Sequence, residues 1–275
     1  MDLWSYVLFF LEMVFYTIGS VVICGLVVGL GERLFLFLMG PGMGRKVVIG
    51  TSLIGTPIHE LSHALMCLIF RHKIQEIKLW QPCSEDGTLG YVTHAYNPKN
   101  PYQVLGNLFI GVGPIFGGLG VIMLCLNFAF PNTLASFFAS TAESLGDGGI
   151  GIWGVFLAGV QIIPHLIAEF FNDDMYLWVR IVGFVVMMSV SLHINLSLAD
   201  IKGAATAIPL YLVLVLIPTV VVSLIGYGAM SATLLAVQSF STLMFAMFTI
   251  VFVFALFQIL LALIVYILRR ALGRK

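Results

Sequence analysis

Long apolar runs dominate this sequence, and three of them cover residues 47–70, 104–130 and 243–268. A helix of about 20 apolar residues crosses the hydrocarbon core of a bilayer. The chain has 275 residues, of which 60% are hydrophobic and only 9% charged, whereas soluble domains are about 25% charged. Since a spanning segment has to satisfy its own backbone hydrogen bonds, these runs predict helices. We therefore expect an integral, multi-pass membrane protein surrounded by the lipid bilayer.

The apolar runs divide the chain into about six spanning segments. We place them at residues 3–30, 47–70, 104–130, 175–198, 205–227 and 243–268. The glycines and proline of residues 40–44 should break the helix between the first two segments. The predicted fold class is an all-α polytopic membrane protein with about six transmembrane helices, forming a single domain over residues 1–275.

A polar insertion at residues 71–102 separates the second segment from the third. Residues 74–80 and 89–96 are rich in isoleucine, valine, threonine and aromatic side chains, which favour strands. Glu85-Asp86-Gly87 between them is typical of a turn. We expect a small β-hairpin at the membrane surface, with a plain connecting loop as the alternative.

Two further stretches are less apolar than the spanning segments. Residues 131–149 are predicted to form a polar, acidic loop. Within residues 150–171, Gln161, His165 and Glu169 recur at every fourth position, which places them on one helix face. Such a polar stripe is typical of an interfacial helix and also of a helix that faces a cavity.

Charge suggests an orientation. Basic residues near the C-terminus and at residues 71–73 are expected on the cytoplasmic side, in the cell membrane, because short basic loops stay inside. Loop 131–149 would then be outside and residues 150–171 would not cross, although the basic side chains within residues 33–46 oppose this assignment. Lys plus Arg and Asp plus Glu are both 13, so no basic face for nucleic acid is predicted. No oligomeric state follows from the sequence.

One short motif lies inside the second apolar run. His59 and His63 are four residues apart, so on a helix both imidazoles lie on one face and can reach one metal ion. Glu60 follows the first histidine, and in zinc hydrolases with this spacing that carboxylate takes a proton from water. A helix with a solvated polar face is the alternative. The apolar surroundings favour a metal site, because ionisable groups inside a bilayer are costly and usually functional.

These motifs together resemble the site-2 protease family of intramembrane zinc metalloproteases. The resemblance covers a core of residues 47–205, with the hairpin at 74–96 as an insertion, a Gly113-Pro114 span and an Asp-containing stretch at 200–203. It implies that His59, His63 and Asp200 bind Zn²⁺ and that Glu60 is the catalytic base. The family usually has Asn-x-x-Pro before Leu-Asp-Gly. Here Asn195 lacks that proline, so the chain looks like a divergent branch.

The third metal ligand has three candidates. Asp200 is favoured, because it lies where the fourth segment would run parallel to the second. Glu169 together with His165 is the strongest competitor, since a histidine and a carboxylate four residues apart can also approach a metal. His193 is the third candidate, with a hydrogen bond inside the helix bundle as its alternative role.

The mechanism expected from this motif is hydrolysis of a peptide bond in a membrane protein or peptide substrate. An edge strand near residues 90–96 would hold the unwound substrate by β-addition, which makes Gly90, Tyr91 and Val92 substrate-binding candidates together with Asn195. The rival class is non-enzymatic. It comprises a membrane protein with a structural metal and a transporter that moves a polar solute past the stripe at 161–169.

Overall fold

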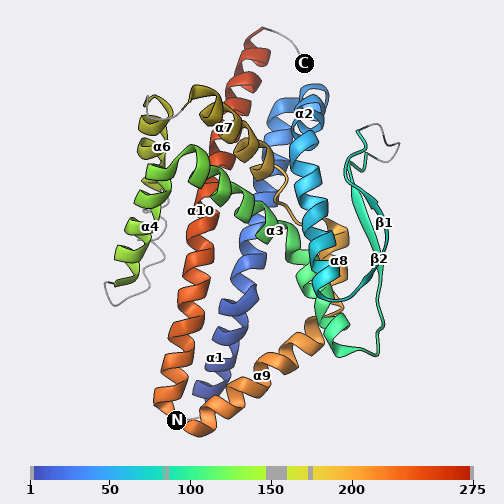
Figure 1. The fold of residues 1–275 in the computed structure, drawn as a ribbon, viewed down its shortest axis with the longest axis vertical. Helices are drawn as coiled ribbons and strands as arrows, with labels where there is room; N and C mark the ends of the chain where they lie inside the picture. The colour runs from blue at the N-terminus through green and yellow to red at the C-terminus, as the bar shows by residue number, and fades with distance from the viewer. Residues whose placement is uncertain (1–2, 83, 85–86, 147–159, 173–175, 273–275) are drawn as a thin grey trace.

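The computed structural model of the protein describes residues 3–82, 84, 87–146, 160–172 and 176–272. Helices make up most of this structure, and Figure 1 shows their arrangement. The elements are α1 (Leu3–Val14), a π-helical turn (Phe15–Gly19), α2 (Ser20–Ile69), β1 (Lys73–Lys78), β2 (Tyr91–Ala95), α3 (Pro101–Ala129), α4 (Pro131–Gly146), α6 (Ile162–Phe170), α7 (Leu177–Ser191), α8 (Leu198–Ala205), α9 (Ile208–Ile225) and α10 (Tyr227–Ala271).

In the part of the chain that the structure describes, four helical stretches are long and apolar enough to cross a membrane. They are Leu3–Ile69, Pro101–Ala129, Ile208–Ile225 and Tyr227–Ala271. The all-α membrane character is thus supported, but the predicted number of about six spans is wrong. The first two predicted segments belong to one stretch of 67 residues. The segment predicted at 175–198 contains only the 15 residues of α7, fewer than a straight span needs.

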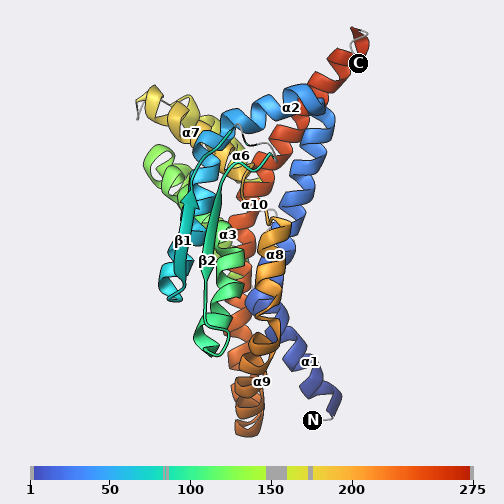
Figure 2. The same cartoon turned by 90° about the vertical axis from the view of Figure 1, so that its right-hand side faces the viewer.

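Gly40 bends the first stretch back on itself. Its φ of 72° lies in the left-handed region that glycine adopts freely. Pro41 begins the next helical leg at once, where its missing N–H is not needed. Figures 1 and 2 show the chain rising through α1 and the first half of α2, then descending through the second half. The break predicted at residues 40–44 is therefore confined to one residue.

Arg269, near the end of α10, stabilises this bend. Its Nη1 donates a hydrogen bond to the carbonyl oxygen of Met39 at 2.6 Å. The bend and the C-terminal end of α10 therefore lie at the same end of the molecule, as Figure 1 shows. The charge-based orientation left residues 33–46 in conflict with a cytoplasmic C-terminus, and the contact with Arg269 places the bend at the same end as the C-terminus. Residues 71–73, which the charge pattern grouped with the C-terminus, follow the far end of the second leg, so that grouping is wrong.

Residues 131–149 were predicted as a loop, but Pro131–Gly146 form helix α4. The reason is a cap supplied from α6. Glu169 accepts hydrogen bonds from the backbone N–H of Asn132 (3.0 Å) and from the N–H (2.7 Å) and hydroxyl (2.6 Å) of Thr133. A carboxylate at a helix N-terminus pairs N–H groups that have no partner within the helix. Of the stripe segment 150–171, residues 150–159 lie outside the described residues, and α6 is only nine residues long.

The predicted hairpin is confirmed as two antiparallel strands. Lys73 pairs with Ala95 and Lys78 with Tyr91, with a bulge between Ile74 and Glu76. Residues 85 and 86 of the predicted turn lie outside the described residues. Figure 2 shows that β2 runs between β1 and the helices α3 and α8. The hairpin therefore lies against the helical core and does not extend away from it.

Helix α3 is the centre of the core. Its side chains at Ile115, Leu119, Ile122 and Leu126 are at most 1% exposed, and they recur at the helical spacing of one face. The glycines on α3 allow close packing, because a Cβ on Gly117 would clash with Ser62 of α2. Small residues at helix contacts are typical of membrane bundles.

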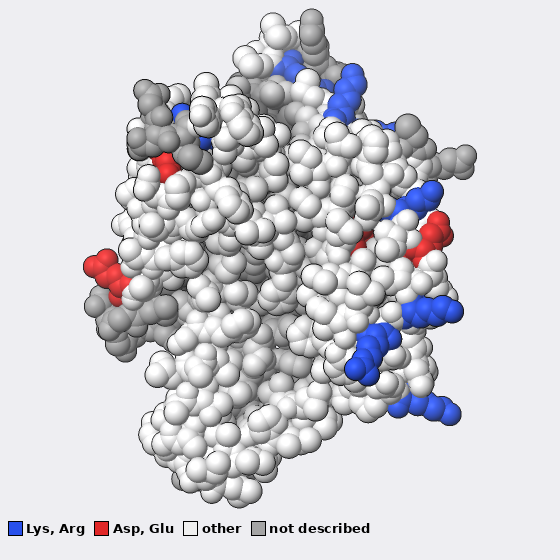
Figure 3. All heavy atoms as spheres, viewed as in Figure 1, with Lys and Arg blue, Asp and Glu red and all other residues white. Residues whose placement is uncertain are grey.

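The molecular surface is also that of a membrane protein. In Figure 3, charged side chains gather beside the hairpin and at the upper end, and the lower part of this face carries none. Helix α9 exposes leucine, isoleucine and valine side chains along its length, among them Val213, Ile217 and Leu224. An exposed apolar helix of this length is suited to lipid and not to water.

We predict that Glu169→Ala destabilises the fold but leaves any metal bound elsewhere in place. Hydrogen bonds to a charged group contribute about 1.5–3 kcal/mol each, so the loss of this cap should lower the thermal midpoint in detergent micelles by several degrees. The exposed Glu143→Ala serves as the control on α4. An unchanged midpoint in Glu169→Ala would contradict the capping role.

Candidate metal centre

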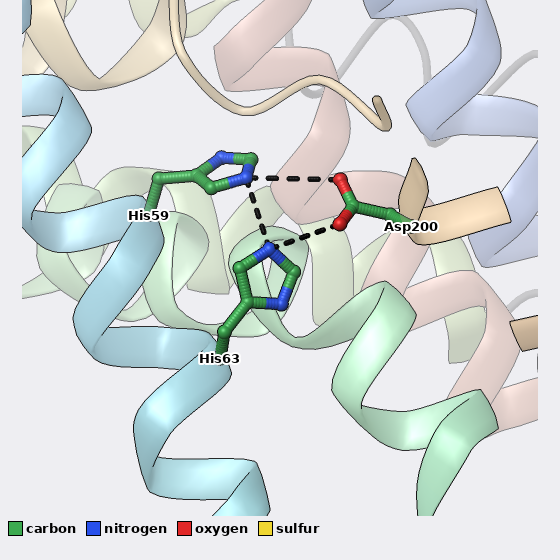
Figure 4. A group of neighbouring side chains, drawn as sticks. All are labelled: His59, His63 and Asp200. Carbon is green, nitrogen blue, oxygen red and sulfur yellow. Dashed lines mark hydrogen bonds and ion pairs between the residues drawn. The ribbon is translucent and has the colours of Figure 1, made fainter. Parts of the chain in front are cut away.

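Three ligand side chains converge from two helices. His59 and His63 project from one face of the second leg of α2, one turn apart, and Asp200 projects from the first turn of α8 (Figure 4). The Nε2 atoms of the two histidines are 3.1 Å apart. Asp200 Oδ1 lies 3.1 Å from His63 Nε2, and Oδ2 lies 3.8 Å from His59 Nε2. Since the ligand atoms all lie within 4.8 Å of one another, this group could hold one metal ion.

Backbone carbonyls fix how both imidazoles point. His59 Nδ1 lies 2.9 Å from the carbonyl oxygen of His193, and His63 Nδ1 lies 2.7 Å from that of Ile110. A carbonyl oxygen only accepts hydrogen bonds, so each Nδ1 carries the hydrogen. In the neutral ring, each Nε2 then carries a lone pair. Metal-ligating histidines have the same outer hydrogen bond. Two lone pairs that face each other at 3.1 Å beside a carboxylate repel each other, and a metal ion between them or a proton on one ring relieves this repulsion.

Asp200 is held in a fixed orientation by the start of α8. Ser197 Oγ accepts from the backbone N–H of Asp200 at 3.1 Å, and Asp200 Oδ2 accepts from the backbone N–H of Ser197 at 2.9 Å. This reciprocal pair is a capping box. Burial raises the pKa of Asp200, but His59 and His63, when their Nε2 atoms are protonated, donate hydrogen bonds and supply positive charge that bring this pKa below its ordinary value. The carboxylate is therefore an anionic ligand.

The linker before α8 brings these groups together. The imidazole of His193 packs on Gly55, where a Cβ would lie only 2.4 Å from its Nδ1. Ile194 is 1% exposed, and a Cβ on Gly118 would lie 2.2 Å from it. Asn195 donates a hydrogen bond from Nδ2 to Glu32 of α2. Glycines on α2 and α3 thus leave the space in which the linker reaches the histidines.

The other two ligand candidates have different roles in the structure. His193 supplies its backbone carbonyl to His59, while its own Nδ1 donates to the carbonyl oxygen of Ser189 at 2.9 Å. Glu169 caps α4. Among the described residues, the group of His59, His63 and Asp200 is the one set of three or more possible ligands.

Glu60 lies beside this group and is 6% exposed. It occupies the position after His59, about 100° around the helix from it, so it borders the metal group without belonging to it. A Cβ on Gly90 would lie 2.9 Å from Glu60 Cγ and 2.6 Å from Thr56 Cγ2. The absence of a side chain at Gly90 therefore lets the hairpin approach this carboxylate.

A cavity of about 400 Å³ contains the metal group and Glu60. It is lined by residues of α2, β2, α3 and α8: His59, Glu60, His63, Thr88, Gly90, Tyr91, Val92, His94, Asn107, Ile110, Gly111, Ser197, Ala199, Asp200 and Gly203. Of the substrate-binding candidates, Gly90, Tyr91 and Val92 line this cavity. Asn195 does not, because its side chain turns to Glu32.

Among the cavity residues that no sequence motif indicated are the polar side chains of His94 and Asn107. His94 was hidden because a histidine within a strand has no diagnostic spacing, and Asn107 because it lies in an apolar run. Burial, then the neighbouring His72 and His63, lowers the pKa of His94. A histidine with a lowered pKa is neutral at pH 7, so His94 is a hydrogen-bonding group and not a cation.

Comparisons with protein-family models, curated proteins and solved structures find no match to this chain. The similarity to the site-2 protease family therefore rests on the motif residues alone.

We predict that the purified protein binds one divalent metal ion per chain and that His63→Ala and Asp200→Ala lose it. Either change leaves two of the three ligands, fewer than catalytic zinc sites have. Metal content after dialysis, measured by mass spectrometry of the element, checks this, with Glu169→Ala as the matched carboxylate control. Full occupancy in Asp200→Ala with loss in Glu169→Ala would contradict the assignment.

Gly55→Ala should weaken metal binding without changing any ligand. The added methyl group displaces the His193 ring and with it the carbonyl that orients His59. Loss of such an outer hydrogen bond lowers metal affinity about 10–100-fold. Gly50→Ala is the control on the same helix, because a Cβ there meets nothing within 4 Å. Equal affinities in the two variants, from competition with a chelator, would show that the carbonyl is not needed.

Proposed function

We propose that the protein is an intramembrane zinc metalloprotease that hydrolyses peptide bonds of membrane-embedded proteins or peptides. The observation that carries this proposal is a buried carboxylate, Glu60, next to a three-ligand group in one cavity. Catalytic zinc sites have three protein ligands and an open position, whereas structural sites have four. The resemblance to site-2 proteases points to the same chemistry.

The ligand set fits zinc. Two imidazole nitrogens and one carboxylate oxygen are ordinary zinc ligands, and both imidazoles have the outer hydrogen bonds that ligating histidines have. Zinc in such a site lowers the pKa of water to about 7 and polarises a carbonyl group. His59, His63 and Asp200 would hold the ion.

Glu60 would be the general base. As a carboxylate it accepts the proton that water loses on attacking the scissile carbonyl, and it then passes this proton to the leaving amine. Its burial excludes bulk water that would compete for the proton. Its place beside the ligands, about 100° around α2 from His59, leaves it free for this role.

Strand β2 would hold the substrate. A substrate helix has to unwind before hydrolysis, because its carbonyls are bonded within the helix. In the described part of the chain, residues 91–95 make backbone hydrogen bonds to β1 alone. The other edge of β2 is available to pair with an extended peptide, and Gly90, Tyr91 and Val92 line the cavity there.

We also propose that the protein lies in the cell membrane with its C-terminus in the cytoplasm. Arg45 and Lys46 follow the bend that Arg269 contacts, and Arg270 follows Arg269 in the chain. A basic end of this kind favours the cytoplasmic side.

The rival, non-enzymatic functions receive less support. A structural metal site would call for a fourth protein ligand, and the described residues supply three. A polar-solute path along residues 161–169 would need a free carboxylate, but Glu169 is bonded to Asn132 and Thr133.

Glu60→Gln is the decisive variant. It should retain zinc, because Glu60 is not part of the ligand group, and it should lose at least about 100-fold in cleavage rate, because general base catalysis contributes 10²–10⁴-fold. Protein in liposomes with a mixture of single-span peptides is assayed by mass spectrometry of the products. Glu76→Gln, on β1, is the control. Zinc loss equal to that of His63→Ala would make Glu60 a ligand, and full activity would exclude it as the base.

A further inference from the structure

His94 and Asn107 are polar side chains that line the cavity outside the metal group and the proposed base. His94 projects from β2 and Asn107 from α3. Asn107 is 4% exposed although it is polar. A buried polar group usually has hydrogen-bond partners, and the partners of these two residues indicate what each can still bind.

A histidine pair fixes the hydrogen positions of His94. His72 Nε2 lies 2.8 Å from the carbonyl oxygen of Gln103, so this nitrogen carries a hydrogen. His72 Nδ1 then accepts, and His94 Nδ1, 3.0 Å away, donates to it. In the neutral ring of His94, Nε2 is therefore a hydrogen-bond acceptor, and no hydrogen bond is recorded for it within the described ranges.

The fold makes space for this pair. His72 is 4% exposed and stacks on Tyr96 with ring centroids 5.2 Å apart. A Cβ on Gly106 would lie 2.8 Å from His72 Nε2 and 2.5 Å from Phe70 Cβ. The glycine thus lets α3 approach closely enough for Gln103 to hold His72.

Asn107 is oriented by the residue that follows helix α8. Its Nδ2 donates to Thr206 Oγ1 at 2.9 Å, and that hydroxyl donates to the carbonyl oxygen of Gly203 at 2.7 Å. Within the described residues, the second N–H and the carbonyl oxygen of this amide make no hydrogen bond, so both can still bind a ligand.

Both side chains line the cavity that contains the metal group. Asn107 is one helical turn from Gln103, which holds the histidine pair, and three residues before Ile110, which holds His63. With a rise of 1.5 Å per residue, Asn107 and Gln103 are about 5 and 10 Å along α3 from Ile110. An extended peptide, at about 3.3 Å per residue, covers this distance in about one to three residues.

We propose that His94 and Asn107 form a polar subsite for the backbone of the extended substrate, about one to three residues from the scissile bond. His94 Nε2 accepts a substrate N–H, and the free N–H of Asn107 donates to a substrate carbonyl. An unwound peptide inside a membrane has backbone groups that water cannot satisfy. Strand β2 pairs with one edge of the peptide, and these two side chains form hydrogen bonds with backbone groups of the peptide that β2 does not pair. This inference rests on the proposed function.

The test compares two probes on the zinc-loaded, full-length protein in detergent micelles. Acetohydroxamate binds the metal alone, and N-acetyl-leucyl-leucine hydroxamate adds peptide backbone. His94→Phe and Asn107→Leu should each weaken the peptide hydroxamate about tenfold, the loss of about one hydrogen bond, with less than twofold change for acetohydroxamate. His94→Gln, whose amide oxygen restores an acceptor, should recover most of the affinity. Calorimetry measures each dissociation constant.

The controls separate binding from folding. Thr93→Ala, on the same strand but outside the cavity lining, should bind both probes as the wild type does, and zinc content reports on the integrity of each variant. Methylation of the peptide nitrogens should remove the difference between the wild type and His94→Phe. Wild-type affinity for the peptide hydroxamate in both variants would overturn the subsite, and so would equal weakening of the two probes.

The outcomes also separate this inference from the proposed function. Selective weakening of the peptide probe, in a protein that cleaves no membrane peptide, would support the subsite and contradict proteolysis. Cleavage that needs Glu60 but is unchanged in kcat/KM by His94→Phe and Asn107→Leu would support proteolysis and overturn the subsite.

Discussion

The hydrogen bond between the ring of His59 and the backbone carbonyl of His193 joins segments 134 residues apart at 2.9 Å. It sets the tautomer of the imidazole, and so it decides that Nε2 is a lone pair that faces the other histidine. The carbonyl is available because the chain leaves α7 at Ser191 and runs as a linker to α8. A longer α7 would have used that carbonyl within the helix, and Asp200 would not reach α2.

Helix α3 supports several parts of the site. Its carbonyl at Ile110 orients His63, and Gln103 holds the histidine pair beneath β2. Its glycines let neighbouring segments approach, since a Cβ on Gly111 would lie 2.7 Å from the carbonyl oxygen of Asp200. Donors and acceptors inside a membrane need partners from the protein itself. The polar site is therefore compatible with an apolar bundle only because α3 provides both hydrogen-bond partners and glycines that allow close packing.

Several errors of the sequence analysis have one physical origin. Residues 131–149 look like a loop because they are polar, but Glu169 caps their N-terminal turn and stabilises a helix there. The stripe that contains Glu169 looks like a metal or solute site because it is polar as well. Distant hydrogen bonds decide both cases, and the residues that form them have no characteristic spacing. Gly40 likewise turns the chain between the first two predicted segments, where a single left-handed residue replaces a loop.

The sequence by itself determined the membrane character, the hairpin and the pair of histidines beside Glu60, because apolar length, strand composition and helical spacing are local properties. It also favoured Asp200 as the third metal ligand. Only the tertiary structure brought Asp200 to the histidines, turned Asn195 away from the cavity to Glu32, and added His94 to its lining. These placements depend on where a linker crosses a helix and on which glycines leave room for it, and packing of that kind is not encoded in any single segment.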